Sequence, residues 1–261
     1  MATSTLMNHR GAREVARNEL AVIEAPPPTK TWYPIAHRAV LDSVWSTLEG
    51  AGFQIRQSRL SLAHGDARFF GTLDLTTSIS DGVSLAVGIR NSTDQSFPIG
   101  FCCGQRVFVC DNLAFTSEIV VSKKHTRFGQ ERYLEGLARA VASLDQYRES
   151  AAGWIKQLQG YELSEDAANS YLLQAYEHDV IGLRLLPLVL REWRNPKFEE
   201  YRPRTAYSLF NAFTTVLGQE RQASFPAESA LATMRLSKLL TPPQVLDVPS
   251  RPVEDEAAIA V

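Results

Sequence analysis

Residues 89–128 read IRNSTDQSFPIGFCCGQRVFVCDNLAFTSEIVVSKKHTRF, in which apolar runs alternate with three short polar clusters. The apolar runs predict β-strands, because side chains along a strand point alternately to the two faces of a sheet. The polar clusters fall where the strands would end, and loops carried on a rigid sheet are common places for binding groups. This stretch therefore predicts both a sheet and a candidate site at its strand ends.

Short turn-forming segments separate the strand candidates, so the sheet is expected to be antiparallel: parallel crossovers need a dozen or more residues. The candidates are residues 53–63, 67–75, 83–89, 99–110 and 118–122. Within 83–89, Val83, Leu85, Val87 and Ile89 alternate with small residues. One face of this strand is then apolar, and either another part of the chain or a ligand must pack closely on the other.

Helical patterns flank the strands. Apolar residues at three- and four-residue steps predict a helix over residues 34–50, and a seven-residue pattern over 134–158 predicts one long amphipathic helix. Residues 161–240 are also expected to be helical, with Ser164 as an N-cap. The order predicts an α+β fold: a helix, a curved antiparallel β-meander of three to five strands, a long amphipathic helix and a helical C-terminal region.

Composition shifts along the chain predict four parts. They are a flexible N-terminal arm at 1–29 ending in three prolines, an α+β core domain at 30–160, a helical C-terminal region at 161–240, and a disordered acidic tail at 241–261.

The formal net charge of −2 provides no global positive field, so any binding to nucleic acid must rely on a local patch. Three cysteines in apolar sequence fit reduced thiols and a cytoplasmic protein. No signal-peptide core and no run of eighteen apolar residues is present, so secretion and membrane association are not expected.

A cationic set stands out at the strand ends, because guanidinium and ammonium groups neutralise phosphates and planar side chains stack on bases. Its members are Arg90, Arg106, Lys123, Lys124, His125 and Arg127. Two plainer interpretations remain open: the lysines belong to a solvated basic loop, and Arg90 pairs with Asp94 to fix its own loop. The residues expected to organise loops are Asn91, Asp94, Ser96, Asp111 and Asn112.

The sequence does not favour an enzyme, and no catalytic residue is assigned. A thiolate site would need Cys110 with His125 as base and Asn112 to orient it, but a cysteine ending an apolar run is usually inert. A zinc site from the cysteines and His125 fails because adjacent Cys102 and Cys103 point to opposite faces. Nucleotide-binding, dinucleotide-binding and common hydrolase motifs are absent from the sequence, so no metal or cofactor is predicted.

Three separated blocks carry a resemblance. The resemblance is carried by the runs GIRNSTDQS, GQRVFVCDNLAF and KKHT, followed downstream by RTAYSLFNAFT. Over residues 32–217 the chain resembles the phage/plasmid-like family of bacterial and viral proteins, a domain of unknown function. The resemblance implies association with mobile elements. The element order is also similar to that of phage single-strand annealing recombinases of the Erf and RecT kind, as a fold-level analogy without shared motifs.

Three functions are therefore expected in order of preference. The first is ATP-independent binding or annealing of single-stranded DNA by a homo-oligomer, with the cationic set holding the phosphate backbone. The second is a small polar-pocket enzyme or regulatory module. Its pocket would contain Arg90, Asp94, Asp111, Asn112 and His125. The third is a virion or assembly protein with a self-associating surface.

Overall fold

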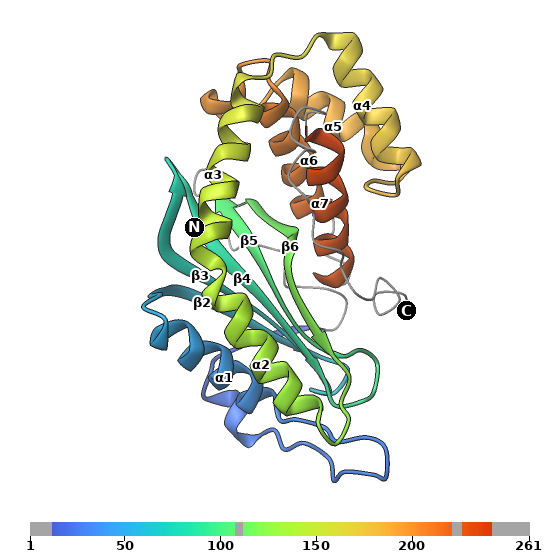
Figure 1. Cartoon of the computed structure of the whole chain (residues 1–261). Coiled ribbons are helices and arrows are strands. Elements are labelled where there is room, and N and C mark those ends of the chain that lie inside the picture. Colours follow the sequence, from blue (N-terminus) through green and yellow to red (C-terminus); the bar gives the residue numbers. More distant parts are fainter. Residues whose placement is uncertain (1–11, 108–111, 221–225, 242–261) are drawn as a thin grey trace.

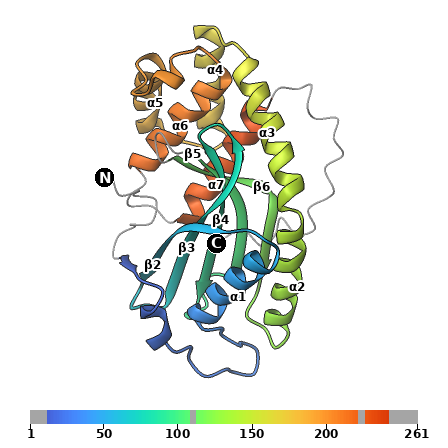
Figure 2. The same ribbon diagram turned by 90° about the vertical axis from the view of Figure 1, so that its left-hand side faces the viewer.

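The computed structural model describes residues 12–107, 112–220 and 226–241 of the chain. These residues form one antiparallel sheet with helices on both sides, which confirms the predicted α+β fold (Figure 1). Figure 2 shows α1 and α2 on one side of the strands and α7 on the other.

Six described strands follow one another in sequence order across the sheet, and each is antiparallel to its neighbour. They are β1 (Arg13–Val15), β2 (Ile55–Ala63), β3 (Arg68–Ser80), β4 (Val83–Ser92), β5 (Ile99–Val107) and β6 (Asn112–Lys123). The meander arises from tight turns at which Gly65 and Gly82 take positive φ angles of 62° and 71°, a conformation that glycine adopts without steric cost. The strand predicted over 99–110 is described only to Val107, and the one predicted over 118–122 already begins at Asn112.

The N-terminal arm contributes a strand, so the predicted three to five strands were too few. β1 pairs with β2, and a short 3-10 helix, η2 (Glu19–Val22), places Leu20 at 0% exposure. The prediction of a flexible arm over 1–29 is wrong for this part; residues 1–11 lie outside the described residues. The sequence signal was weak because the strand has three residues and only Val15 faces the core.

The first face of the sheet carries Val83, Leu85, Val87 and Ile89, and it packs against α1 (His37–Gly50), α2 (Gly129–Ala142) and α3 (Leu144–Gly160). Each fully buried aliphatic side chain in such a layer stabilises the fold by about 1.5–3 kcal/mol. This face therefore holds the main hydrophobic core of the described chain.

The second face carries Ser84, Ala86, Gly88 and Arg90 on β4, the small positions predicted to be closely packed. Phe115 of β6 fills this space: a Cβ on Gly88 would lie 2.8 Å from its ring. The packing of α7 (Pro226–Leu240) beside β6 adds to this small second cluster.

The long helix predicted over 134–158 is two helices, α2 and α3, which follow each other end to end and change direction where they meet at Ser143 (Figure 1). The Ser143 hydroxyl donates to the carbonyl oxygen of Arg139 at 3.0 Å, and its backbone N–H is shared between the carbonyls of Arg139 and Ala140. A serine that bonds back to the fourth preceding carbonyl competes with the regular ladder and bends a helix.

The C-terminal region is helical as predicted. Its helices are α4 (Glu165–Glu177), α5 (Leu186–Arg194), α6 (Ala206–Glu220) and α7, with two short 3-10 helices, η3 (Leu183–Leu185) and η4 (Glu199–Tyr201). Ser164 caps α4 as expected, since its Oγ accepts the N–H of Ala167 at 3.1 Å. Trp154 of α3 meets Phe210 of α6 edge to face at 5.1 Å, which joins this region to the core. The acidic residues of the predicted tail lie outside the described residues.

Candidate nucleic-acid interface

Arg106 does not belong to a cationic surface, and that prediction is wrong. Its Nε donates to Asp74 Oδ1 at 2.7 Å, and the two side chains are only 2% and 1% exposed. In the ladder between β5 and β6, Arg106 stands opposite Leu113 whereas Lys123 stands opposite Ile99. Seven residues of strand separate the two positions on β5, about 23 Å at ~3.3 Å per residue. Arg106 is therefore a buried structural charge at the other end of the sheet.

Arg90 lies on the second face of the sheet, and it does not pair with Asp94 as one interpretation expected. Its Cζ is 5.6 Å from the centre of the Phe97 ring, a cation–π contact. Asp94 instead accepts from Arg68 Nε at 2.7 Å.

The loop between β4 and β5 is organised by Asp94 and Ser96 as predicted. Asp94 Oδ1 accepts the backbone N–H of Ser96 at 3.0 Å and its hydroxyl at 2.5 Å. Partial burial raises the pKa of Asp94, but the hydrogen bonds from Ser96 and Arg68 outweigh it and hold that pKa below its usual value. Asp111 lies outside the described residues, and of Asn112 only its place in β6 is described.

Asn91 has a different role from the loop turn expected for it. Its Nδ2 donates to the Ile35 carbonyl at 2.8 Å and to His37 Nδ1 at 2.9 Å, while His37 Nε2 donates to the Asp66 carbonyl at 2.9 Å. These partners assign the Nε2–H tautomer to His37. Asn91 therefore ties the first face of β4 to the segment that begins α1.

His125 is buried beside this cluster, so the prediction that it stacks on a base is wrong. It is 5% exposed, and its two ring nitrogens are buried without a hydrogen-bond partner. Burial lowers the pKa of both His37 and His125, and the neighbouring His37 lowers that of His125 further. Both rings are neutral in the folded chain at pH 7.

The histidine pair predicts an acid-sensitive fold. Below pH ~6.5 the unfolded chain takes up protons that the folded chain refuses, so the free energy of unfolding falls by up to about 1.4 kcal/mol per pH unit for each histidine. The loss begins at the unfolded pKa and continues down to the lowered folded pKa. Urea unfolding between pH 7.5 and 5.5 measures it, and His125→Gln is expected to flatten the slope. The exposed His178→Gln serves as control; an equal slope in all three proteins would contradict the prediction.

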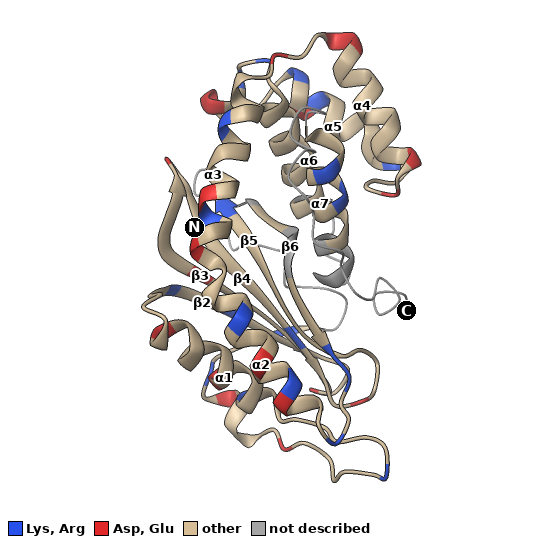
Figure 3. Cartoon of the chain, in the orientation of Figure 1, with Lys and Arg blue, Asp and Glu red and all other residues tan. Residues whose placement is uncertain are grey.

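The segment from Lys123 to Phe128, here called the β6–α2 loop, keeps the remaining members of the cationic set together. Lys124 and Arg127 are exposed and Lys123 is half-buried, and within the described chain none of the three has an ion pair. Figure 3 shows positive residues at this end of β6 and near the start of α2. The positive end of the α2 dipole adds to the same potential.

Phe128 is a residue of this loop that the sequence analysis missed. It is 55% exposed, and the guanidinium carbon of Arg127 lies 5.7 Å from its ring centre. Its place directly after a run of six basic or polar residues, 122–127, was the available signal. An exposed aromatic ring beside unpaired cations is the combination that single-stranded nucleic acids bind.

The backbone holds the β6–α2 loop in one shape. Tyr33 donates its N–H to the His125 carbonyl at 2.8 Å, Thr126 donates to the Lys124 carbonyl at 2.9 Å, and Gly129 donates to the Thr126 carbonyl at 2.8 Å. The buried His125 anchors the loop from within. Lys124, Arg127 and Phe128 are consequently presented on a fixed frame, which lowers the entropy lost on binding.

No thiolate chemistry is supported by the described cysteines. Burial raises the pKa of Cys102 to about 12, so it stays a thiol, and Cys103 is buried. Cys110, the proposed nucleophile, lies outside the described residues. Within the described parts of the chain, no three His, Cys, Asp or Glu side chains gather as a metal site would require.

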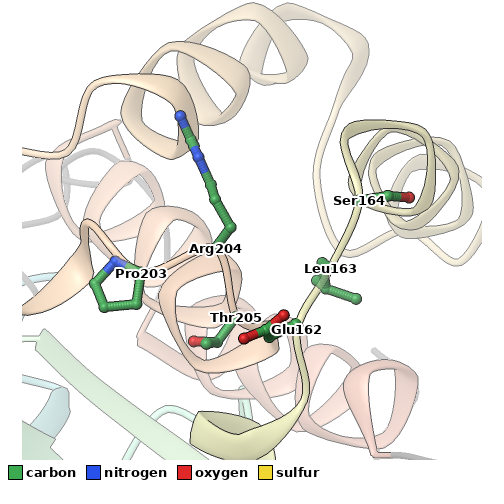
Figure 4. Close-up of a pocket in the computed structure, with 6 residues that line it drawn as sticks. All are labelled: Glu162, Leu163, Ser164, Pro203, Arg204 and Thr205. Atoms are coloured by element: carbon green, nitrogen blue, oxygen red, sulfur yellow. The ribbon is translucent and has the colours of Figure 1, made fainter.

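A pocket of about 600 Å³ lies away from the sheet, where the segment before α4 meets the segment before α6 (Figure 4). It is lined by Glu162, Leu163, Ser164, Pro203, Arg204 and Thr205. Arg204 turns away to the Trp193 and Arg194 carbonyls, and Ser164 is occupied as the α4 cap. The Arg204 and Ser164 side chains that line the pocket are therefore already engaged in hydrogen bonds within the protein.

The described helices include none with the length and apolar character needed to span a membrane. The exposed large apolar side chains of this region include Leu173 and Tyr176 on α4 and Leu183 on η3. The homo-oligomer expected from the sequence stays a prediction.

Comparisons with known proteins leave the function open. No family model matches the chain, and neither a curated protein nor a solved structure matches it. The resemblance to the phage/plasmid-like family therefore stays a prediction.

Proposed function

We propose that this chain binds single-stranded nucleic acid through the β6–α2 loop, as an ATP-independent binding or annealing protein of a mobile element. The observation that carries the proposal is Phe128, an exposed ring set between Arg127 and the positive end of α2, with Lys123 and Lys124 in the same loop. Arg106 and His125 take no part as direct contacts, because both are buried.

The mechanism is electrostatic positioning without covalent chemistry. Lys123, Lys124 and Arg127 neutralise successive phosphates, and one base stacks on Phe128. Such contacts read no sequence, because every base has a π-face and every nucleotide a phosphate. The Watson–Crick edges of the other bases stay free to pair, which is what an annealing protein requires.

Fluorescence anisotropy with a labelled oligothymidylate tests the proposal. Phe128→Ala is expected to weaken binding about tenfold, since loss of base–aromatic stacking costs roughly 1–3 kcal/mol. Replacing Lys123 and Lys124 together by Ala is expected to reduce the slope of log K against log salt by about 1.4, at ~0.7 per single-strand phosphate contact.

Matched controls lie elsewhere on the surface. Tyr161→Ala removes an aromatic ring of comparable exposure between α3 and α4, and Lys156→Ala with Lys238→Ala removes two exposed charges from α3 and α7. Both control proteins are expected to bind as the unaltered chain does. The proposal fails if the loop variants bind as tightly as the controls.

The polar-pocket enzyme has less support. Arg90 projects from the second face of β4, whereas Asn91 contacts the start of α1 on the first face and His125 lies near His37 on that side. Asp94 is already engaged by Arg68 and Ser96. The described members of the expected pocket therefore do not face a common space.

A further inference from the structure

Arg90 lies flat across the neighbouring strand on the second face. It stands opposite Gly100 of β5, and a Cβ on Gly100 would lie 3.0 Å from both Cγ and Nε of Arg90. Gly100 in turn stands opposite Ser122 of β6. The absence of a side chain at Gly100 thus lets the Arg90 side chain run over β5 on the face that it shares with Ser122.

The Arg90 guanidinium lacks a counter-ion in the described chain. Its contact there is the Phe97 ring, and it makes no hydrogen bond or ion pair with a described residue. Burial lowers its pKa, which reports the cost of keeping this charge away from water. A guanidinium has five donors in a fork that fits the oxygens of a carboxylate or phosphate.

Groups near Arg90 cannot supply the missing negative charge. Burial raises the pKa of Cys102 to about 12, so this neighbour is a neutral thiol. The carboxylate of Asp94, in the loop that follows β4, is held by Arg68 and Ser96. This carboxylate is therefore not available to pair with Arg90.

Ser122 provides an independent sign of a ligand. Its Oγ is buried and has no hydrogen-bond partner. Buried hydroxyls usually find a partner, so this hydroxyl is available to a bound water or ligand atom. A hydroxyl two strands from Arg90 on the same face, about 9.6 Å between backbones at ~4.8 Å per strand, is within reach of a group that the long arginine also contacts.

We propose that Arg90 and Ser122 form an oxyanion site that takes a phosphate group. The guanidinium supplies paired N–H donors and the serine a hydroxyl donor, and the exposed Lys124, two residues after Ser122, adds positive charge that favours a multiply charged anion over a carboxylate. The site goes beyond the proposed function, because a free phosphate and a phosphodiester offer the same oxygens. It lies on the sheet face, separate from Phe128 and Arg127.

Thermal unfolding tests the site with inorganic phosphate as the probe, against sodium chloride at equal ionic strength. A ligand that binds the folded chain raises the Tm. The unaltered chain is expected to gain Tm with phosphate beyond chloride, Arg90→Gln to lose this gain, and Arg90→Lys and Ser122→Ala to keep a reduced part of it. Arg132→Gln, an exposed arginine on α2, is expected to keep all of it.

The outcomes separate this site from the proposed function. If oligothymidylate but not inorganic phosphate stabilises the chain, and Arg90→Gln removes that effect, the phosphate belongs to a nucleic acid strand. If phosphate acts through Arg90 while no oligonucleotide binds, the site stands and the proposed function falls. A phosphate gain equal in the unaltered chain, Arg90→Gln and Ser122→Ala overturns the site, as does stabilisation by neither probe. Should Arg90→Gln fail to fold, Ser122→Ala decides, because it removes a single hydroxyl.

Discussion

Asp74→Ala is expected to lower the free energy of unfolding by about 3–5 kcal/mol, because it leaves the Arg106 charge in the interior without this carboxylate. The ion pair is 2.7 Å long and both side chains are almost fully buried. Urea unfolding followed by circular dichroism measures the loss.

An exposed ion pair of the same length provides the control. Arg202 and Glu199 also lie 2.7 Å apart, but their side chains are 68% and 76% exposed. Glu199→Ala is expected to change stability by less than about 1 kcal/mol, since water screens such pairs. The double variant Asp74→Leu with Arg106→Met removes both buried charges, so it is expected to be more stable than Asp74→Ala alone. Equal losses in Asp74→Ala and Glu199→Ala would show that burial does not govern the pair.

Arg106 also shows which features could be predicted from the sequence and which could not. The strand predicted over 99–110 correctly placed Arg106 on a strand, and alternation predicted the two faces of β4. The partner of Arg106 is Asp74, 32 positions earlier and on β3. Only the register of three strands brings the two together, and a one-residue slip would turn either to the other face.

The β6–α2 loop likewise has some features that the local sequence predicts and others that depend on contacts in the tertiary fold. The basic run at Lys123 and Lys124 was visible because charge is a property of the residues themselves. The inward turn of His125 was not, because it depends on Tyr33 and His37, which reach the loop only through the tertiary fold. The exposure of Phe128 likewise depends on what the fold leaves uncovered.

Gly104→Ala is expected to lower the free energy of unfolding by about 3 kcal/mol, at the upper end of the usual cost of overpacking. A Cβ at this position would lie 2.2 Å from the Ala114 carbonyl oxygen and 2.8 Å from Cδ1 of Phe115. The first contact is with backbone, so a change of rotamer cannot relieve it. β6 must move away from β5, and Phe115 must leave the space over Gly88 that it fills on the second face.

Gly153→Ala is the matched control, since a Cβ there meets no atom within 4 Å. Gly153 lies exposed within α3, where alanine is a better helix former than glycine. The exchange is expected to raise stability by about 0.8–1 kcal/mol. Urea unfolding of the two variants therefore separates two effects. One is the steric clash at β5, and the other is the stabilisation expected when alanine replaces glycine and lowers the conformational entropy of the unfolded chain. A Gly104→Ala protein as stable as the unaltered chain would mean that β5 and β6 are not packed this closely, and the small second face would then need another explanation.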